Sequence, residues 1–260
     1  MFVKQHGSGS EVYFCIHGWS GSHRTFEPLL PFLPDTATVY SADLPGCGVS
    51  AVPLKWTLAS VTQEIVAALD ATGAVPVTLV GNCLGALLAL RVAAKRPETV
   101  RRVVLIDAFA RWPWYFRVFT YPGLGKYAYA STFANPIGRW LTNRALSARR
   151  TAESDLTQGF VDQPHDVHLQ YLNILREIES VDEFAALSMP VDIVFGSRTF
   201  AAVRDSAWAW LAMWPQARIR EIPQAGHLVL QEAPGVVGEL IFGGGACRAE
   251  SAVTSSNMHQ

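Results

Sequence analysis

The chain has 260 residues, of which 50% are hydrophobic and 17% are charged, and its formal net charge at pH 7 is −1. A chain of this length and composition can bury the core of one large α/β domain, which argues against disorder. The near-neutral charge argues against nucleic acid as the main partner. Residues 1–9 lack the apolar run of a signal peptide, and no apolar stretch is long enough to span a bilayer. We therefore expect a cytoplasmic protein without a transmembrane segment.

The four cysteines are scattered along the chain, and none has a second cysteine or a histidine at metal-ligand spacing. Neither a zinc site nor a disulfide is expected in such a chain. No glycine loop for phosphate binding follows the first apolar run, so we expect no metal, nucleotide or flavin cofactor. Residues 243–260, which include Cys247, are rich in Gly, Ala and Ser and are expected to form a flexible tail.

Short apolar runs alternate with longer helical patterns, which is typical of parallel βαβ units. The runs predict strands over Val12–Ile16, Thr38–Ser41, Val77–Val80, Val103–Ile106, Val191–Phe195 and Arg218–Ile222. The helical patterns lie at Val61–Thr72, Leu84–Lys95 and Ser206–Trp214. Residues 109–186 carry no strand signal, and an interval of that length predicts a helical cap inserted between strands. The core would then comprise residues 1–108 and 187–242.

The strongest motif is Gly81-Asn82-Cys83-Leu84-Gly85, which lies directly between an expected strand and an expected helix. It is a G-x-S-x-G nucleophile elbow with cysteine in the serine position. The sharp turn exposes the central side chain, and the two glycines avoid collisions in so tight a turn. The helix N-terminus beneath Cys83 favours negative charge, which predicts a lowered pKa for its thiol. The alternative is that Cys83 is a buried structural thiol in a protein that keeps the elbow but has lost catalytic activity.

Two further stretches lie before the elbow. His17-Gly18-Trp19 follows the first expected strand, and Asp43-Leu44-Pro45-Gly46-Cys47-Gly48-Val49-Ser50 keeps a D-x-x-G-x-G-x-S pattern. With the elbow, these stretches resemble the α/β-hydrolase fold superfamily over roughly residues 10 to 240. The resemblance implies a mostly parallel central sheet flanked by helices. It also implies an oxyanion hole formed by the backbone N–H groups of Trp19 and Leu84.

A catalytic histidine is needed to take the proton from the nucleophile and to return it to a leaving group. Gln224-Ala225-Gly226-His227 follows the last expected strand and resembles the Gly-His pair that bears this histidine in the superfamily. We therefore predict that His227 is the catalytic base and acid, and we expect surface or packing roles for His23, His165 and His168.

The third member of a triad is not at its commonest place. There the G-x-x-D pattern reads Gly196-Ser197-Arg198-Thr199, so a threonine replaces the aspartate. Asp107, at the end of an apolar strand beside the elbow, is the predicted acid, because a buried carboxylate requires a partner and His227 is the natural one. Asp205 is the alternative acid, and a purely structural Asp107 is the other alternative.

The predicted triad therefore consists of Cys83, Asp107 and His227, in the chain order of nucleophile, acid and histidine that this fold uses. With its acid moved to the earlier strand, it resembles the α/β-hydrolase-fold Dieckmann cyclases that release tetramate or pyridone products. Dienelactone hydrolases and polyester synthases also carry a cysteine at the elbow.

The first half of the expected cap is basic and aromatic. Residues 108–152 contain no aspartate or glutamate but include Arg111, Arg117, Lys126, Arg139, Arg144, Arg149 and Arg150. One interpretation is an amphipathic cap with a solvated basic face. The other is that the arginines attract an anionic partner while aromatic side chains line an acyl pocket. Coenzyme A, an acidic acyl carrier protein or an anionic membrane surface would fit the second interpretation.

A cysteine nucleophile favours thioester chemistry, because a thiolate that attacks a thioester keeps the acyl group activated. We therefore expect an enzyme that forms an acyl-cysteine intermediate from a hydrophobic acyl ester or thioester. Cyclisation, transfer or hydrolysis would then release the acyl group, with CoA or an acyl carrier protein as the carrier. The alternatives are a plain carboxylesterase or lactone hydrolase and, from another class, a non-catalytic ligand-binding protein of the same fold.

Overall fold

A computed structural model describes residues 1–111, 113–161, 164–178 and 180–243 of the chain. Residues 244–260, which make up nearly all of the expected tail and include Cys247, lie outside the described residues, as does Trp112. In the described part of the chain, no helix is both long enough and apolar enough to cross a membrane.

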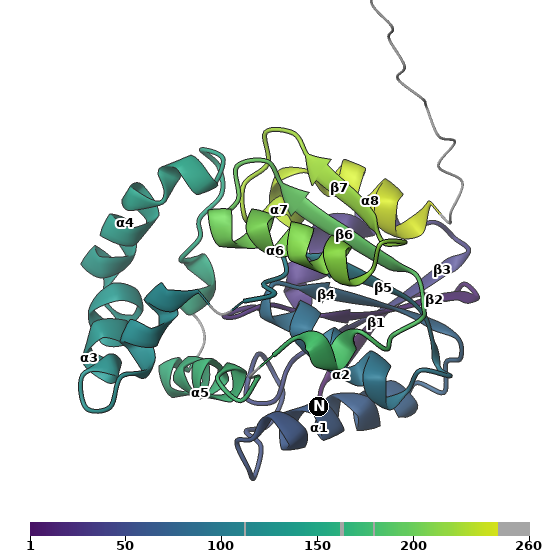
Figure 1. The fold of residues 1–260 in the computed structure, drawn as a ribbon, viewed down its shortest axis with the longest axis horizontal. Helices are drawn as coiled ribbons and strands as arrows, with labels where there is room; N and C mark the ends of the chain where they lie inside the picture. The colour runs from purple at the N-terminus through teal and green to yellow at the C-terminus, as the bar shows by residue number, and fades with distance from the viewer. Residues whose placement is uncertain (112, 162–163, 179, 244–260) are drawn as a thin grey trace, which may run out of the picture.

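A seven-stranded sheet forms the centre of the molecule, with the strand order β1-β3-β2-β4-β5-β6-β7 (Figure 1). Its strands are β1 (Val3–Gly7), β2 (Glu11–Ile16), β3 (Ala37–Ala42), β4 (Val77–Asn82), β5 (Val100–Ile106), β6 (Val191–Gly196) and β7 (Arg218–Ile222). Strand β1 pairs antiparallel with β3, and every other neighbouring pair is parallel. The expected mostly parallel sheet is therefore confirmed, and all six expected strands are present.

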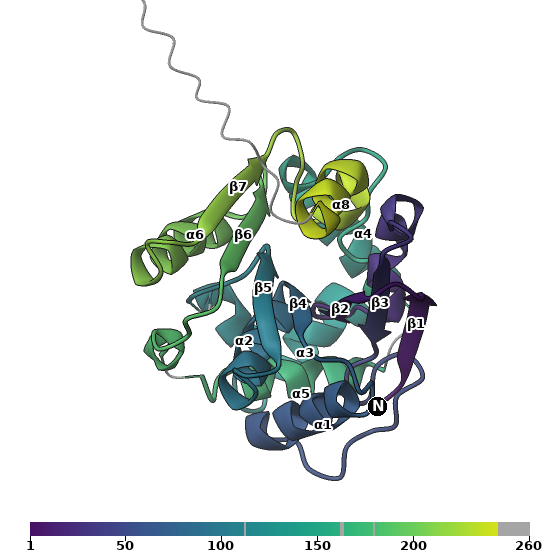
Figure 2. The ribbon, with the colours of Figure 1, turned by 90° about the vertical axis from the view of Figure 1, so that its right-hand side faces the viewer.

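The two faces of the sheet are covered by different helices (Figure 2). Along β5 the side chains alternate: Val103 and Leu105 belong to one hydrophobic cluster, whereas Val104 and Ile106 belong to the other. The helices of the first face are α1 (Leu58–Asp70), α2 (Leu84–Lys95) and α6 (Ala201–Met213). Those of the second face are η1 (His23–Phe32), α7 (Val229–Glu232) and α8 (Pro234–Phe242). This arrangement leaves the carboxyl ends of the parallel strands for a binding site.

Between β5 and β6 the described residues form helices and the loops that join them but no strand, as expected for this segment. We call residues 109–186 the cap segment. Its helices are η2 (Trp114–Thr120), α3 (Gly125–Tyr129), η3 (Ala130–Ala134), α4 (Pro136–Ala145), η4 (Ser147–Arg149), η5 (Gln158–Phe160), α5 (His165–Leu175) and η6 (Asp182–Phe184). Tyr129, Phe133 and Phe160 form a separate small cluster against which Trp19 packs. The cap segment is thereby packed against the loop that follows β2.

Candidate active site

The turn between β4 and α2 holds Cys83 in a conformation that few non-glycine residues adopt. Its φ is 52° and its ψ is −113°, and its backbone N–H donates to the Ile106 carbonyl oxygen at 2.8 Å. A Cβ on Gly81 would lie 2.4 Å from the Ala86 Cα, and one on Gly85 would lie 2.2 Å from the Ile16 carbonyl oxygen. Both glycines are therefore required sterically, as the elbow motif predicts, and the strand before and helix after it are present.

Two backbone N–H groups act on the Cys83 sulfur. Those of Trp19 and Leu84 are hydrogen-bond donors whose effect is to lower the thiol pKa. The loop that carries Trp19 is held by His17, whose Nδ1 lies 2.8 Å from the Gly18 carbonyl oxygen and whose Nε2 accepts from the Leu44 N–H at 3.0 Å. Two backbone donors thus converge on the Cys83 sulfur.

The predicted lowering of the Cys83 pKa is wrong. Burial, the largest cause, raises the pKa of this thiol to about 12, and it outweighs the two backbone donors. The nearby Asp107 charge raises it further. The helix N-terminus favours a thiolate, but here desolvation of the charged form dominates. The resting site therefore contains a neutral thiol, which needs a base at the moment of attack.

His227 lines the same cavity as Cys83, and its side chain is 14% exposed. Its backbone N–H donates to the Arg149 carbonyl oxygen at 2.8 Å, and the Phe200 ring packs edge-on at 4.9 Å. Burial lowers the pKa of His227 to about 4, so the imidazole is neutral near pH 7. A neutral imidazole can accept the proton that a neutral thiol must lose.

Asp107 lies beneath His227 with a fully buried side chain. Its Oδ2 is 3.6 Å from His227 Nδ1, and its Oδ1 accepts from the Gly196 N–H at 3.4 Å. Its φ of 48° is again in the left-handed region. Burial raises the Asp107 pKa well above its usual value, while Gly196 and the Thr199 hydroxyl lower it by hydrogen bonding. Asp205, the alternative acid, lies exposed on α6.

The cavity around Cys83 has a volume of about 470 Å³. Aromatic and aliphatic side chains of the cap segment form much of its wall, among them Tyr115, Phe116, Phe119, Phe133, Leu146 and Phe160. Such a lining suits a hydrophobic acyl chain.

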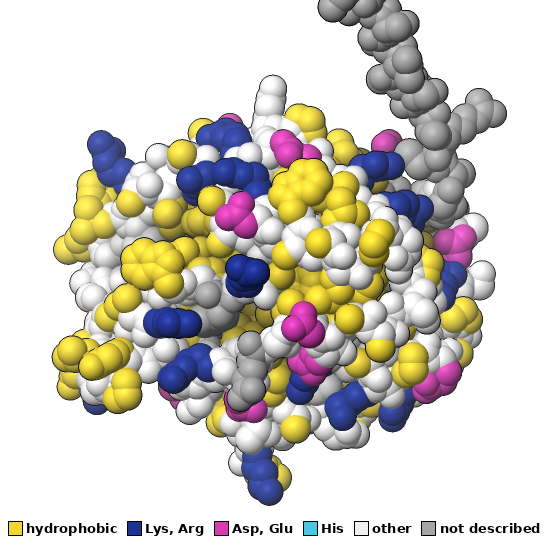
Figure 3. Space-filling view, in the orientation of Figure 1, with side chains coloured by type: hydrophobic (Ala, Val, Ile, Leu, Met, Phe, Trp, Pro, Cys, Tyr) yellow, Lys and Arg dark blue, Asp and Glu magenta, His cyan; other side chains and the backbone are white. Residues whose placement is uncertain are grey.

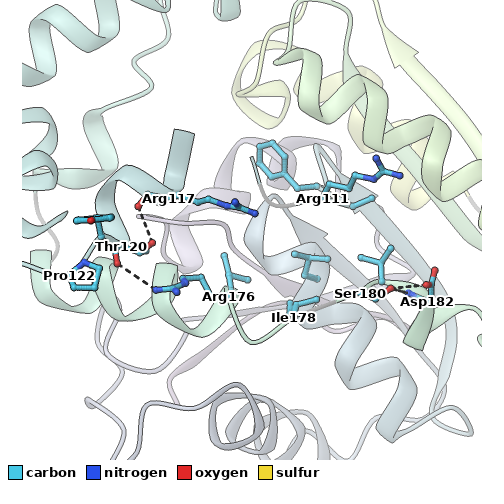
Figure 4. A pocket seen from close by; sticks show the side chains of 14 residues that line it. Arg111, Arg117, Thr120, Pro122, Arg176, Ile178, Ser180 and Asp182 are labelled. Carbon is cyan, nitrogen blue, oxygen red and sulfur yellow. Dashed lines mark hydrogen bonds between the residues drawn. The ribbon is translucent and has the colours of Figure 1, made fainter. Parts of the chain in front are cut away.

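A second cavity of about 960 Å³ adjoins the first, since Leu87, Phe109 and Leu175 line both. Arg111, Arg117 and Arg176 reach into it from the cap segment (Figure 4). Within the described residues, no carboxylate pairs with Arg111 or Arg117. In the space-filling view, Lys and Arg side chains lie among hydrophobic ones on the side that the cap segment forms (Figure 3). Asp182 also lines the second cavity, so three arginines and one aspartate leave it with net positive charge beside the apolar one.

Not all basic side chains of the cap segment are solvated. The Arg149 guanidinium donates to the Thr199 carbonyl oxygen at 3.2 Å, and that of Arg139 donates to the Phe133 carbonyl oxygen at 3.0 Å. Arg150 donates to three carbonyl oxygens of its own loop. These three arginines hold backbone in place, so the solvated basic face is smaller than the composition indicates.

The sequence interpretation missed two contributors to the site. The first is Thr199, which stands out in the sequence only because it replaces the aspartate of the G-x-x-D pattern. Its Oγ1 is 3.1 Å from His227 Nδ1. Glu232 accepts from the Gly226 N–H beside His227 and from Thr151 of the cap segment, the latter at 2.9 Å. Thr199 could have been noticed from its place in the G-x-x-D pattern, whereas nothing local distinguishes Glu232.

Comparison with known proteins gives a family and several relatives. Residues 14–234 match the family described as alpha/beta hydrolase fold. A pimeloyl-[acyl-carrier protein] methyl ester esterase of Neisseria meningitidis is 35% identical over 138 residues, which is 51% of this chain and 52% of that protein. The match thus spans about half the length of that relative. One of the same name from Chromobacterium violaceum is 27% identical, over 87% of this chain and 91% of its own.

Solved structures agree at the level of the fold. A thermophilic esterase from Thermogutta terrifontis superposes with a TM-score of 0.75 at 22% identity, covering 92% of this chain and 90% of that one. Cfl2 from Burkholderia cenocepacia gives a TM-score of 0.75 at 20% identity, with the same coverage of 92% and 90%. With the family match, the elbow and the sheet order, these likenesses show that the chain belongs to the alpha/beta hydrolase fold family.

Proposed function

We propose that this protein is an esterase-type enzyme that forms an acyl intermediate on Cys83 and takes its acyl chain from an ester or thioester on an acyl carrier protein or CoA. The observation that carries the proposal is the pair of adjoining cavities. One is apolar and contains Cys83 and His227, and the other is lined by three arginines. The relatives named for an acyl-carrier-protein methyl ester support a carrier-bound substrate.

In the proposed reaction, the Cys83 sulfur attacks the substrate carbonyl carbon while His227 Nε2 takes the thiol proton. The N–H groups of Trp19 and Leu84 stabilise the negative charge that develops on the carbonyl oxygen. The carbon–oxygen or carbon–sulfur bond of the substrate then breaks, and His227 returns the proton to the leaving alcohol or thiol. His227 then takes a proton from a water molecule as that water attacks the acyl-cysteine. The carbon–sulfur bond breaks, His227 returns the proton to the Cys83 sulfur, and the acid is released.

The arginines of the second cavity would bind the phosphate of a carrier's pantetheine arm, or the acidic surface of the carrier itself. Arg111 and Arg117 are suited to this role because no carboxylate of the described residues forms an ion pair with them. The acyl chain would extend from that cavity into the apolar one, across the shared wall of Leu87, Phe109 and Leu175.

A second candidate function is release by cyclisation or transfer in place of hydrolysis. The cysteine favours it, because an acyl thioester is more electrophilic toward carbon or nitrogen than an oxoester. Mass analysis of products decides between the two. Hydrolysis gives an acid containing one oxygen from ¹⁸O-labelled water, whereas cyclisation or transfer gives an unlabelled product.

The proposal is tested by comparing acyl-carrier-protein, acyl-CoA and nitrophenyl esters of the same chain length. We expect a kcat/KM at least about tenfold higher for the carrier-bound substrates, since charge steering and binding act only on them. Equal values for all three substrates would favour a plain carboxylesterase or lactone hydrolase. No turnover of any of them would favour the non-catalytic binding protein.

A further inference from the structure

The hydroxyl of Thr199 lies between the two polar groups that a triad would connect directly. Its Oγ1 is 3.1 Å from His227 Nδ1, within hydrogen-bond distance. The nearest approach of the Asp107 carboxylate to the same nitrogen is 3.6 Å, which exceeds that distance. The Thr199 hydroxyl also lowers the pKa of Asp107, so it lies close to that carboxyl, whose Oδ2 has no hydrogen-bond partner among the described residues. One hydroxyl therefore hydrogen-bonds to the histidine and lies close to the acid.

The position of this hydroxyl is held by the backbone and by two arginines. The Thr199 N–H donates to the Gly196 carbonyl oxygen at 3.0 Å, and its own carbonyl oxygen accepts from Arg149 at 3.2 Å and from Arg204 at 3.1 Å. Its side chain is buried completely. A residue fixed this firmly presents its hydroxyl to His227 without losing conformational entropy during the reaction.

The direction of the hydrogen bonds follows from the number of protons available. A hydroxyl has one proton to donate, and a carboxylate can only accept. The two oxygens nearest His227 Nδ1, the Thr199 hydroxyl at 3.1 Å and the Asp107 Oδ2 at 3.6 Å, can both accept from an N–H, so the imidazole proton belongs on Nδ1. The lone pair of the imidazole is then on Nε2, where the base needs it.

We propose that Thr199 is a positioning residue that accepts a hydrogen bond from the Nδ1 proton of His227 beside Asp107 and thereby holds the imidazole in the tautomer with its proton on Nδ1. The inference rests on the proposed function and deepens it, because it assigns to the acid's usual position a hydroxyl that fixes the tautomer of the histidine. Thr199 does not touch the reacting atoms and acts only through His227.

The test replaces Thr199 by valine, which keeps the shape and removes the hydroxyl, and by serine, which keeps the hydroxyl. Thr62→Val is the matched control, because Thr62 is an equally buried threonine on α1 whose hydroxyl donates to the Leu58 carbonyl oxygen. Three quantities are measured in each folded variant. They are kcat and KM on a nitrophenyl ester, and the His227 tautomer from ¹⁵N chemical shifts of histidine-labelled protein.

Thr199→Val should lower kcat by about 100-fold with KM nearly constant, since loss of the correct tautomer in other triads costs 10⁴. Its ¹⁵N spectrum should show the His227 proton moved partly to Nε2. Thr199→Ser should keep at least about a third of the wild-type kcat and the Nδ1–H tautomer. Thr62→Val should behave as the wild type in both measurements.

A Thr199→Val protein with the wild-type kcat and tautomer would overturn the inference, as would a serine variant that is as impaired as the valine variant. The tautomer measurement needs no substrate. If the wild type turned over none of the acyl substrates, the proposed function would fail, while the spectra would still decide the role of Thr199.

Discussion

At the scale of single residues, burial governs the protonation of the site. It raises the Cys83 pKa to about 12 and lowers the His227 pKa to about 4. Both shifts disfavour charge, so a preformed thiolate–imidazolium pair is not the resting state. The thiol proton would leave only as the sulfur attacks, as the hydroxyl proton does in a serine enzyme.

Alkylation of Cys83 by iodoacetamide tests this resting state. Because only the thiolate reacts and its fraction rises tenfold per pH unit below the pKa, the rate should increase about tenfold per unit from pH 7 to pH 9 without a plateau. The rate is measured by mass spectrometry of the Cys83 peptide, and the buried Cys15 and Cys47 should stay unlabelled in native protein. A fast rate that is constant between pH 6 and pH 8 would instead indicate a thiolate paired with His227.

Two aspartate variants separate the candidate acids. Asp107→Asn should lower kcat by about 10² to 10⁴, because the imidazolium that forms during attack loses the carboxylate that stabilises it. Asp205→Asn should leave kcat within about threefold, since this residue is exposed on α6. Initial rates on a nitrophenyl ester measure both. The reverse pattern would assign the acid to Asp205. If neither variant changed kcat, the role of Asp107 would be purely structural.

At the scale of elements, the cap segment and the loop of His227 are tied together by backbone contacts. The Arg149 carbonyl oxygen in η4 accepts from the His227 N–H, and the Arg149 guanidinium donates to the Thr199 carbonyl oxygen. The Glu232 carboxylate accepts from the backbone N–H groups of Gly226 and Thr151. A change of Arg149 would therefore disturb His227 itself and cannot report on charge steering. Arg111 and Arg117 are better probes, because they line the second cavity.

The double variant Arg111→Gln/Arg117→Gln should lower kcat/KM for an acyl-CoA or acyl-carrier substrate by about tenfold. The loss should shrink as salt is added, because exposed charges are screened over about 10 Å at 0.1 M. Turnover of a small neutral ester should stay within about twofold. Lys95→Gln, at the far end of α2 about 18 Å from the elbow, is the control with one charge removed.

Equal losses on the neutral ester and on the carrier-bound substrate would show damage to the cap segment. No loss on either substrate would leave these arginines as ordinary surface charges and would favour the plain esterase.

The elements that the sequence predicts well are those with continuous apolar runs. Strand β7 was predicted with its observed bounds, and β6 within one residue, because both are flanked by clear turn residues. Strand β1 is missed, since its sequence VKQHG is mostly polar and its antiparallel place at the sheet edge leaves three of its residues exposed. Thr199 was missed as a contributor because its contact with His227 joins two loops that only the folded sheet brings together.

At the scale of the whole molecule, buried histidines couple stability to pH. Burial lowers the pKa of His17 and of His168 to about 4, as it does for His227. His17 is held neutral by one donated and one accepted hydrogen bond. In the unfolded chain these groups would titrate near 6.5, so the unfolded state binds more protons between about pH 4 and pH 6.5.

The free energy of unfolding should therefore fall as the pH is lowered through this window, by up to about 1.4 kcal/mol per pH unit for each histidine. The raised pKa of Asp107 acts in the opposite sense, so the net slope is smaller. Urea unfolding at pH 7.5, 6.0 and 5.0 measures the slope, and His168→Gln should make it shallower. An equal slope in wild type and variant would show that His168 does not stay neutral in the folded protein.

Trapping of the acyl-enzyme shows whether the acyl group passes through Cys83. The enzyme is mixed with acyl-CoA or acyl-carrier substrate, quenched in acid within its first turnovers and analysed by intact and peptide mass spectrometry. We expect one added acyl mass on the peptide that contains Cys83, and neither adduct nor turnover in Cys83→Ala. Turnover by Cys83→Ala at the wild-type rate, or an acyl group found on another residue, would contradict it.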